Sequence, residues 1–191
     1  MRKIILASAS PRRKELLKQI GVEFSIEKAA GEEVLTTDIP TEAVKELACQ
    51  KAREIADKYD ADVIIGADTV VAAAGQILGK PKDAEDAVRM ITMLQGCAHE
   101  VITGVTVILK KEKKEICFAE ATTVHVFPMT EAQIRTYVDS KEPMDKAGAY
   151  GIQGRFAAYV SGIEGDYNNV VGLPVGRLYQ ELLRAGIDLL R

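Results

Sequence analysis

The sequence predicts an α/β fold: a long, bent, mixed β-sheet with flanking helices, arranged as two lobes around a central cleft. Short apolar segments alternate with amphipathic helical segments along much of the chain, which is typical of strands joined through helices. Two long segments of alternating polarity then follow one another, as in a β-hairpin. We expect residues 1–191 to form one domain, because a chain of 191 residues is long enough to bury the core of a single α/β domain.

Strong local signals bound the first strand and the first helix. Residues 4–7 form a short apolar run, which predicts a strand. Ser10 is a favourable N-cap and Pro11 suits the first helical position, so a helix is expected from Pro11 to about Ile20. Residues 22–26 are then predicted to form a second strand.

A long amphipathic helix is predicted from Thr41. Its apolar side chains share one face: Ala43, Val44, Leu47, Ala48, Ala52, Ile55 and Ala56. Residues 63–67 are a continuous apolar run typical of a strand buried on both faces, and we expect this strand to stop at Asp68. Asp83 is expected to cap a further helix that ends at Gly96.

The second half of the chain is predicted to begin with a hairpin. Residues 99–109 and 115–127 alternate in polarity and are joined by a lysine-rich tip. A helix over residues 130–138 and a glycine-rich loop over residues 143–154 follow. The last expected elements are strands at residues 156–163 and 167–171 and a helix that Pro174 opens, with Val175, Leu178, Leu182 and Leu183 on its inner side.

Composition excludes some partners and compartments. The chain has 25 Lys plus Arg and 28 Asp plus Glu, and a net charge of −3 argues against bulk attraction to nucleic acid or to an anionic membrane. A local basic cleft remains compatible with that balance. No apolar run is long enough to span a bilayer, and Cys49, Cys97 and Cys117 lack metal-type spacing. We therefore expect a cytoplasmic protein whose cysteines are reduced, small core residues.

The turn from Ser8 to Arg13 is a candidate anion site. Free backbone N–H groups at a helix start, two serine hydroxyls and two guanidinium groups would all favour a phosphate. Arg12 and Arg13 otherwise lie at the unfavourable positive end of the helix dipole. The alternative is a capped surface helix whose arginines point into water.

Carboxylates provide candidate catalytic and metal-binding groups. Asp68, next to Thr69, follows a buried strand, and the ends of such strands are the usual edge of a site in open α/β sheets. A carboxylate there could bind a divalent metal or accept a proton from water. Glu32 and Glu33 lie in a loop and would suit Mg²⁺ if they approached Asp68. The alternatives are an aspartate that starts a turn and two exposed glutamates.

Two glycine-containing segments are further candidates. Pro81 favours an extended conformation at Lys80, which would direct the ammonium outward. The segment from Gly75 to Pro81 does not have the spacing of a P-loop, and Gly148, Gly151 and Gly154 do not have that of a dinucleotide fingerprint. Within residues 145–154, Gln153 has groups that could pair with the edge of a base, and Tyr150 offers a ring or a hydroxyl. A structural turn is the alternative for this loop.

Several of these segments together resemble the Maf family of nucleoside triphosphate pyrophosphatases, nearly from end to end. The matching segments are Ser8-Ala-Ser-Pro-Arg-Arg13, Gly31-Glu-Glu33, Lys51-Ala-Arg53, Gly66-Ala-Asp-Thr69, Gly79-Lys-Pro81, Asp145-Lys-Ala-Gly-Ala-Tyr-Gly-Ile-Gln-Gly154 and Val170-Val-Gly-Leu-Pro174. The resemblance implies a bent mixed sheet related to the inosine triphosphate pyrophosphatases. It also implies hydrolysis between the α- and β-phosphates, which yields a nucleoside monophosphate and pyrophosphate.

The resemblance further implies roles for individual residues. Asp68 matches the proton acceptor that activates water, and Glu33 together with Asp68 would bind a divalent metal, Mg²⁺ or Mn²⁺. The remaining matches are a substrate-selectivity set, Arg12, Thr69 and Gln153, and a phosphate-binding set, Ser8, Arg13, Lys51 and Lys80. The Arg/Thr/Gln combination resembles the branch that acts on dTTP and UTP.

The expected partner is a nucleoside triphosphate, with no nucleic acid and no membrane, and a homodimer is expected at the level of the family. A second hypothesis is a nucleotide-binding regulator of cell division and septum formation in which catalysis is incidental. Nucleic-acid binding through the basic N-terminal turn is a third hypothesis, which the net charge disfavours.

Overall fold

The computed structural model describes residues 2–190, which divide into two compact units. Unit 1 contains residues 2–68, 103–120 and 172–190. Unit 2 contains residues 69–102 and 121–171. The chain therefore passes between the units several times, and each unit is described separately below.

A mixed seven-stranded sheet organises residues 2–190, as predicted. The strands are β1 (Ile4–Ala7), β2 (Ser25–Ile26), β3 (Val63–Ala73), β4 (Gln76–Leu78), β5 (Ala98–Leu109), β6 (Lys114–Val126) and β7 (Val160–Glu164). Their order is β2-β1-β3-β5-β6-β7, and β4 pairs with β3. In unit 1, β1 is parallel to both β2 and β3, whereas in unit 2 the pairs β3–β4 and β6–β7 are antiparallel.

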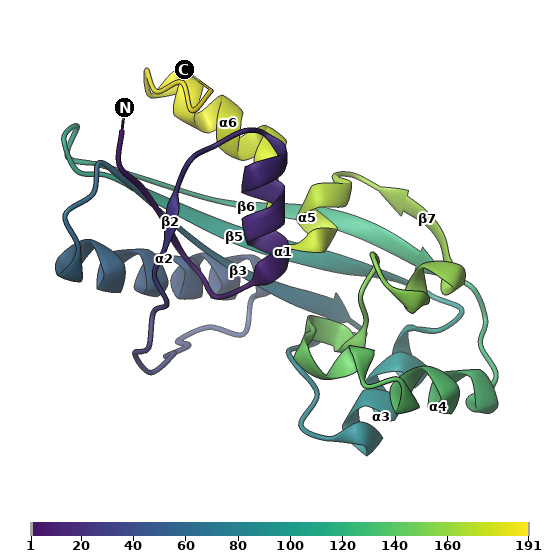
Figure 1. Ribbon diagram of the computed structural model, residues 1–191. Coiled ribbons are helices and arrows are strands. Elements are labelled where there is room, and N and C mark those ends of the chain that lie inside the picture. The colour runs from purple at the N-terminus through teal and green to yellow at the C-terminus, as the bar shows by residue number, and fades with distance from the viewer. Residues whose placement is uncertain (1, 191) are drawn as a thin grey trace. The chain divides into compact units, whose positions relative to one another are not determined.

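Helices flank the sheet in both units (Figure 1). They are α1 (Pro11–Gln19), α2 (Pro40–Lys58), α3 (Ala84–Leu94), α4 (Glu131–Asp139), α5 (Tyr167–Val171) and α6 (Val175–Arg184), with short 3₁₀ turns at Glu142–Asp145, Ala147–Ala149 and Arg155–Tyr159. In unit 1, α1 and α6 lie on one side of the strands and α2 lies on the other (Figure 1). In unit 2, α3 and α4 lie side by side. No helix within residues 2–190 combines the length and the low polarity required to cross a bilayer.

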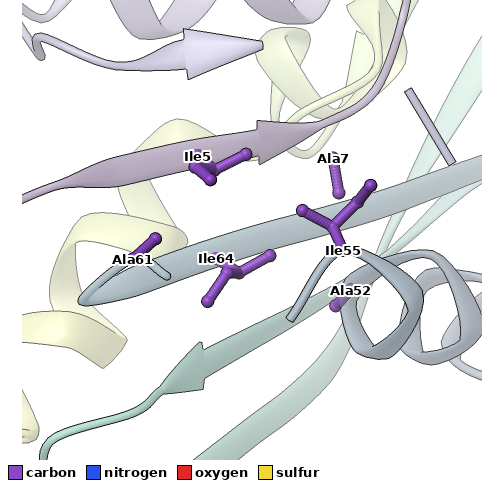
Figure 2. Close-up of a cluster of buried hydrophobic side chains, with 6 residues drawn as sticks. All are labelled: Ile5, Ala7, Ala52, Ile55, Ala61 and Ile64. Carbon is purple, nitrogen blue, oxygen red and sulfur yellow. The ribbon is translucent and has the colours of Figure 1, made fainter. Parts of the chain in front are cut away.

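The core of unit 1 forms where α2 packs on the parallel strands. Ile5 of β1, Ile64 of β3 and Ile55 of α2 are each at most 1% exposed and belong to one apolar cluster (Figure 2). Small side chains at Ala7 and Ala52 complete the contact between these layers. Each buried isoleucine contributes about 1.5–3 kcal/mol through the removal of apolar surface from water, so this layer fixes α2 against the sheet.

Two glycines bring α2 unusually close to the sheet. A Cβ atom at Gly66 would collide with the carbonyl oxygen of Ala48, and one at Gly104 would collide with the backbone of Val44. Only glycine permits this contact between helix backbone and strand backbone. The backbone of α2 consequently contacts β3 directly at Gly66, two residues before Asp68.

The predicted end of the third strand is wrong, because β3 does not stop at Asp68 but continues to Ala73. Pairing with β1 does end at Gly66, and beyond that point Val71 and its neighbours pair with β4 instead. The β-branched run Thr69-Val70-Val71 favours this extension. The strand predicted to stop at Asp68 thus lacked the β3–β4 hairpin that follows it.

Other predicted boundaries also need correction. The predicted strand over 22–26 is only Ser25–Ile26, and that over 156–163 is β7 preceded by a 3₁₀ turn. The predicted strand over 167–171 is helix α5, because the Asp166 carboxylate accepts a hydrogen bond from the Asn168 N–H and caps the turn. Leu183 is 38% exposed, so it does not belong to the inner face of α6.

The cysteines are free thiols but not core residues as predicted. Cys97 and Cys117 are exposed and Cys49 is half-buried. Cys117 lies on the outer part of β6, where alternation directs its side chain away from the core. Burial and the nearby Glu115 carboxylate raise the pKa of Cys49 to about 11, which leaves this thiol protonated and unreactive near neutral pH.

Candidate active site

Three of the predicted site residues meet in unit 1. The Lys51 ammonium lies 2.5 Å from Asp68 Oδ1 and 2.9 Å from Glu33 Oε1. The side chains of Lys51 and Asp68 are 18% and 16% exposed, whereas that of Glu33 is 56% exposed. The pair Lys51–Asp68 is thus largely removed from water, and charge interactions within it are stronger than at an open surface.

Packing of α2 on the sheet creates this contact. Gly66 and Asp68 lie on the same face of β3 because side chains alternate along a strand. Helix α2 touches that face at Ala48 and Ala52, so Lys51 on the adjoining turn reaches the Asp68 carboxylate. The glycine in the segment Gly66-Ala-Asp-Thr69 therefore has a structural role in the site.

The loop that carries Glu33 is held against α2 by a row of polar side chains. Glu54 accepts hydrogen bonds from the N–H groups of Ala30 and Gly31, at 3.0 Å each. The Gln50 amide bonds both the N–H and the carbonyl of Val34. Hydrogen bonds from the Ala30 N–H, Lys58 and the Gly31 N–H lower the pKa of Glu54 to about 2, so the carboxylate remains an acceptor.

The same row continues at Glu46, whose carboxylate accepts the N–H and hydroxyl of Thr36 at 2.9 and 2.8 Å. These residues were not among the predicted site residues. Their spacing by four residues along α2 was the available signal, since Glu46, Gln50 and Glu54 must share one helix face.

An open hollow of about 610 Å³ adjoins Glu33 and Lys51 within unit 1. Its lining includes residues 29–33 and the polar side chains of Gln50, Lys51, Arg53, Glu54 and Lys58. The volume lies within the range of small-molecule sites. The lining carries charges of both signs, with the cations Lys51, Arg53 and Lys58 and the carboxylates Glu32, Glu33 and Glu54.

Arg13 and Ser8 occupy a rigid position beside this cluster. Arg13 Nε donates to the Gly172 carbonyl at 2.7 Å, and Nη1 donates to Ser8 Oγ at 3.2 Å and to the Ala67 carbonyl at 2.9 Å. Burial lowers the pKa of Arg13, and the nearby Asp68 carboxylate opposes that shift. Arg13 thus fixes the backbone immediately before Asp68. Its predicted contact with phosphate stays a prediction.

The N-terminus of α1 has the predicted geometry. The Ser10 hydroxyl accepts the Arg13 N–H at 3.5 Å, and Pro11 occupies the first turn. Arg12 lies in the same turn and is half-buried. Ser8, only 8% exposed, accepts a hydrogen bond from the Ser10 N–H, so the turn is ordered by its own hydroxyls.

The remaining predicted residues, Thr69, Lys80 and Gln153, belong to unit 2. Lys80 is exposed and lies beside Gly79, whose carbonyl accepts the N–H of Gly148 at 3.0 Å. Gln153 is exposed in a turn of the same glycine-rich loop. The structure therefore brings the segments that carry Lys80 and Gln153 together within unit 2.

Tyr150 is a core residue, so it does not offer an exposed ring for stacking. It is 5% exposed, and its hydroxyl lies 2.7 Å from His99 Nε2. Burial, with a smaller contribution from His125, lowers the pKa of His99 to about 4. Burial also raises the pKa of Tyr150 far above its usual value, so both partners are neutral near pH 7.

The donor set fits a weakly held hard cation. Glu33 and Asp68 converge on one ammonium, which shows that their oxygens can face a single positive charge. Within residues 2–190, no group of three or more His, Cys, Asp or Glu side chains converges to hold a metal. Two carboxylates suffice for Mg²⁺, because this ion keeps several waters and takes further oxygens from substrate phosphates.

Comparisons with known proteins place the chain among its relatives. A family model described as Maf-like protein matches residues 3–185. A dTTP/UTP pyrophosphatase of Agathobacter rectalis is 55% identical and covers 98% of this chain and 100% of that protein. One of Lachnoclostridium phytofermentans is 51% identical, with coverage of 100% and 99%. The solved structure of the Staphylococcus aureus Ham1 protein has a TM-score of 0.58 at 13% identity over 97% of this chain and 100% of that chain, which shows a shared fold.

Proposed function

The chain belongs to the Maf family, and from that premise we propose that it is a nucleoside triphosphate pyrophosphatase that hydrolyses dTTP and UTP. The products are the nucleoside monophosphate and pyrophosphate. Relatives that carry this activity in their names match this chain over almost its whole length. The observation that carries the proposal is the largely buried contact between Asp68 and Lys51.

Asp68 is proposed as the general base. Water attacks the α-phosphorus, Asp68 accepts the proton that the water loses, and the bond from the α-phosphorus to the bridging oxygen breaks to release pyrophosphate. Lys51 holds one Asp68 oxygen and neutralises negative charge beside the reacting phosphates. Positioning and charge neutralisation dominate reactions of this kind, so no covalent intermediate is required.

Phosphate binding is assigned to Ser8, Arg13, Lys51 and Lys80. Support comes from the helix start at Ser10, where backbone N–H groups and the dipole of α1 favour an anion. Lys80 is exposed on unit 2 and would act as a mobile point charge.

Glu33 and Asp68 would hold a divalent cation, Mg²⁺ or Mn²⁺. When bound, the cation would neutralise charge on the phosphates and polarise their oxygens. The carboxylates already face a common positive charge on Lys51, and the row Glu46, Gln50 and Glu54 orders the loop that carries Glu33.

Base selectivity is assigned to Arg12, Thr69 and Gln153. These side chains carry the hydrogen-bonding groups needed to read a pyrimidine edge. A site that bonds one base edge rejects a base that leaves the same groups unpaired. Selectivity should therefore depend on side chains other than those that neutralise phosphate.

The proposal extends to organisation and location. It describes a single Maf domain over residues 1–191, a cytoplasmic enzyme and a homodimer that binds neither nucleic acid nor membranes. The net charge of −3 supports the absence of nucleic-acid and membrane partners, and the free thiols support a reducing compartment. Sedimentation of the purified protein would measure the oligomeric state.

The test is a nucleotide panel with purified protein and Mg²⁺. We expect dTTP and UTP each to yield one pyrophosphate per nucleoside monophosphate. Chelation of the metal should abolish turnover, and added Mg²⁺ should restore it. Release of inorganic phosphate instead of pyrophosphate would contradict attack at the α-phosphorus. Absence of turnover with every pyrimidine triphosphate by the folded protein would refute the proposed function.

A further inference from the structure

We propose that Tyr137 and Glu142 are positioning residues that set the conformation of the turn carrying Gln153 and thereby control nucleotide selectivity. This inference rests on the proposed function, because Gln153 is taken to read the base. All of the contacts that carry it lie within unit 2. Neither Tyr137 nor Glu142 is among the site residues predicted from the sequence.

The turn is held on both sides of Gln153. On one side, the Gly151 N–H donates to the Tyr137 hydroxyl oxygen at 3.2 Å. On the other, the Arg155 N–H donates to Glu142 Oε2 at 3.0 Å. The Tyr137 hydroxyl donates in turn to Glu142 Oε1 at 3.0 Å, so a single hydrogen-bonded pair fixes both ends of the turn.

Close packing reinforces these hydrogen bonds. A Cβ atom at Gly154 would collide with the Glu142 carboxylate, and one at Gly151 would lie 2.6 Å from Lys146 Cε. The Lys146 ammonium donates to the Glu142 carbonyl at 2.6 Å. The two glycines therefore let the side chains of Glu142 and Lys146 lie directly on the turn backbone, which restricts its conformations.

Burial makes Tyr137 a firm support. It is 3% exposed, and its ring packs against Phe156 with a centroid separation of 5.1 Å. Burial also raises the pKa of Tyr137 far above its usual value, so the hydroxyl keeps the proton that it donates to Glu142. Gln153 is exposed in contrast, so a rigid backbone presents a side chain that is open to a ligand.

Selectivity should respond to this support more than turnover does. An amide that reads a base must be placed accurately, because a small displacement removes the hydrogen bonds that separate one base from another. Neither Tyr137 nor Glu142 is assigned a contact with phosphate or with the attacking water. Loss of the anchor should therefore reduce discrimination between UTP and CTP, which differ in the groups on one edge of the base.

The main variant is Tyr137→Phe, which keeps the ring and removes the hydroxyl. Its matched control is Tyr159→Phe, since Tyr159 packs on the same Phe156 ring and its hydroxyl makes no hydrogen bond within residues 2–190. We expect the ratio of kcat/KM for UTP to that for CTP to fall about tenfold in Tyr137→Phe, with kcat for UTP retained, and to stay unchanged in the control.

A second variant, Glu142→Gln, keeps the side-chain shape but replaces one acceptor oxygen with a donor. Its control is Glu131→Gln, an exposed residue on α4. Glu142→Gln should lower the same ratio, and Glu131→Gln should not. Hydrogen exchange of the peptide spanning residues 151–155 should be faster in Tyr137→Phe and Glu142→Gln than in both controls.

The outcomes separate the inference from the proposed function. If the wild-type protein does not hydrolyse UTP, the function fails, while faster exchange in the two variants would still show that they anchor the turn. If wild type is active and exchange rises without any change in the selectivity ratio, the inference is overturned. Unchanged exchange would overturn it as well.

Discussion

The two units hold their candidate residues by different physical means. In unit 1, Asp68, Lys51 and Glu33 carry charge and contact one another, and Arg13 binds backbone carbonyls beside them. In unit 2, Gln153 is neutral, and hydrogen bonds and packing fix the backbone on either side of it. One region is organised by charge compensation and the other by the shape of a turn.

This difference suggests that the two regions affect different properties, the rate of hydrolysis for the charged cluster of unit 1 and the choice of base for the turn of unit 2. Stabilisation of developing charge on phosphate requires fixed ions of the kind found in unit 1. Discrimination between bases requires donors and acceptors at fixed points, as the turn in unit 2 provides. Substitutions in the charged cluster of Asp68, Lys51 and Glu33 should accordingly lower turnover with all nucleotides, whereas substitutions around Gln153 should change which nucleotide is preferred.

The largest expected effect is that of Asp68→Asn. The substitution preserves size but removes the proton acceptor, so kcat for UTP should fall about 10³-fold. Asp62→Asn is the matched control, because Asp62 is another unit 1 carboxylate paired with a lysine and its side chain is also 16% exposed. Pyrophosphate release measures both variants. Wild-type turnover by Asp68→Asn would remove Asp68 from the role of base.

Arg13→Ala should have the next largest effect. It removes hydrogen bonds to Ser8 and to the carbonyls of Ala67 and Gly172, and turnover with every nucleotide should fall about 10²-fold as Asp68 loses its support. Arg12→Ala, from the same helical turn, should instead change the UTP-to-CTP ratio. Steady-state kinetics with UTP and CTP would measure both effects. Equal effects of the two variants would contradict the assignment of Arg13 to turnover and of Arg12 to selectivity.

Much of the fold follows from local sequence signals. Helix α1 has the expected Ser10 cap and Pro11 start, and the hairpin of β5 and β6 lies where it was predicted, although only β6 alternates in burial and residues 101–107 of β5 are all buried. Errors arose where tertiary contacts determined the outcome. Strand β3 continues past Asp68 because β4 pairs with it, and the residues of α5 looked extended although Asp166 caps a helix there.

The contacts within the candidate site could not be predicted from the sequence. Asp68 and Glu33 were selected from local signals and Lys51 from the family resemblance, and their roles stay predictions. Only the close packing of α2 on Gly66 explains why the three side chains meet. The supports of the turn around Gln153 were not selected at all. Tyr137 and Glu142 carry no local signal for that role, because the N–H groups that they bind become neighbours only after folding.

Gln153→Ala should have a smaller effect that sharpens the contrast between units. The UTP-to-CTP ratio of kcat/KM should fall about tenfold, because the base would lose one hydrogen-bonding side chain while the phosphates keep their binding residues. The control is Gln133→Ala, whose amide only completes the cap of α4. A measurement of kcat/KM on both nucleotides suffices. A large fall in kcat with an unchanged ratio would place Gln153 with the charged cluster instead.

The smallest expected effect is on stability and arises from the neutral core of unit 2. Burial lowers the pKa of His99 from its usual 6.5 to about 4, so between these values the unfolded chain binds a proton that the folded chain does not. Its contribution to stability is therefore present above pH 6.5 and is lost as the pH falls toward 4. From pH 7 to pH 5.5, the loss should be about 1 kcal/mol.

Urea unfolding of wild type and His99→Gln at pH 7 and 5.5 would isolate this contribution. His99→Gln removes the buried titration and should lose less stability on acidification than wild type. This acid-dependent loss belongs to unit 2, because His99 lies there and burial keeps it neutral. An unchanged pH dependence in His99→Gln would contradict that difference between the units.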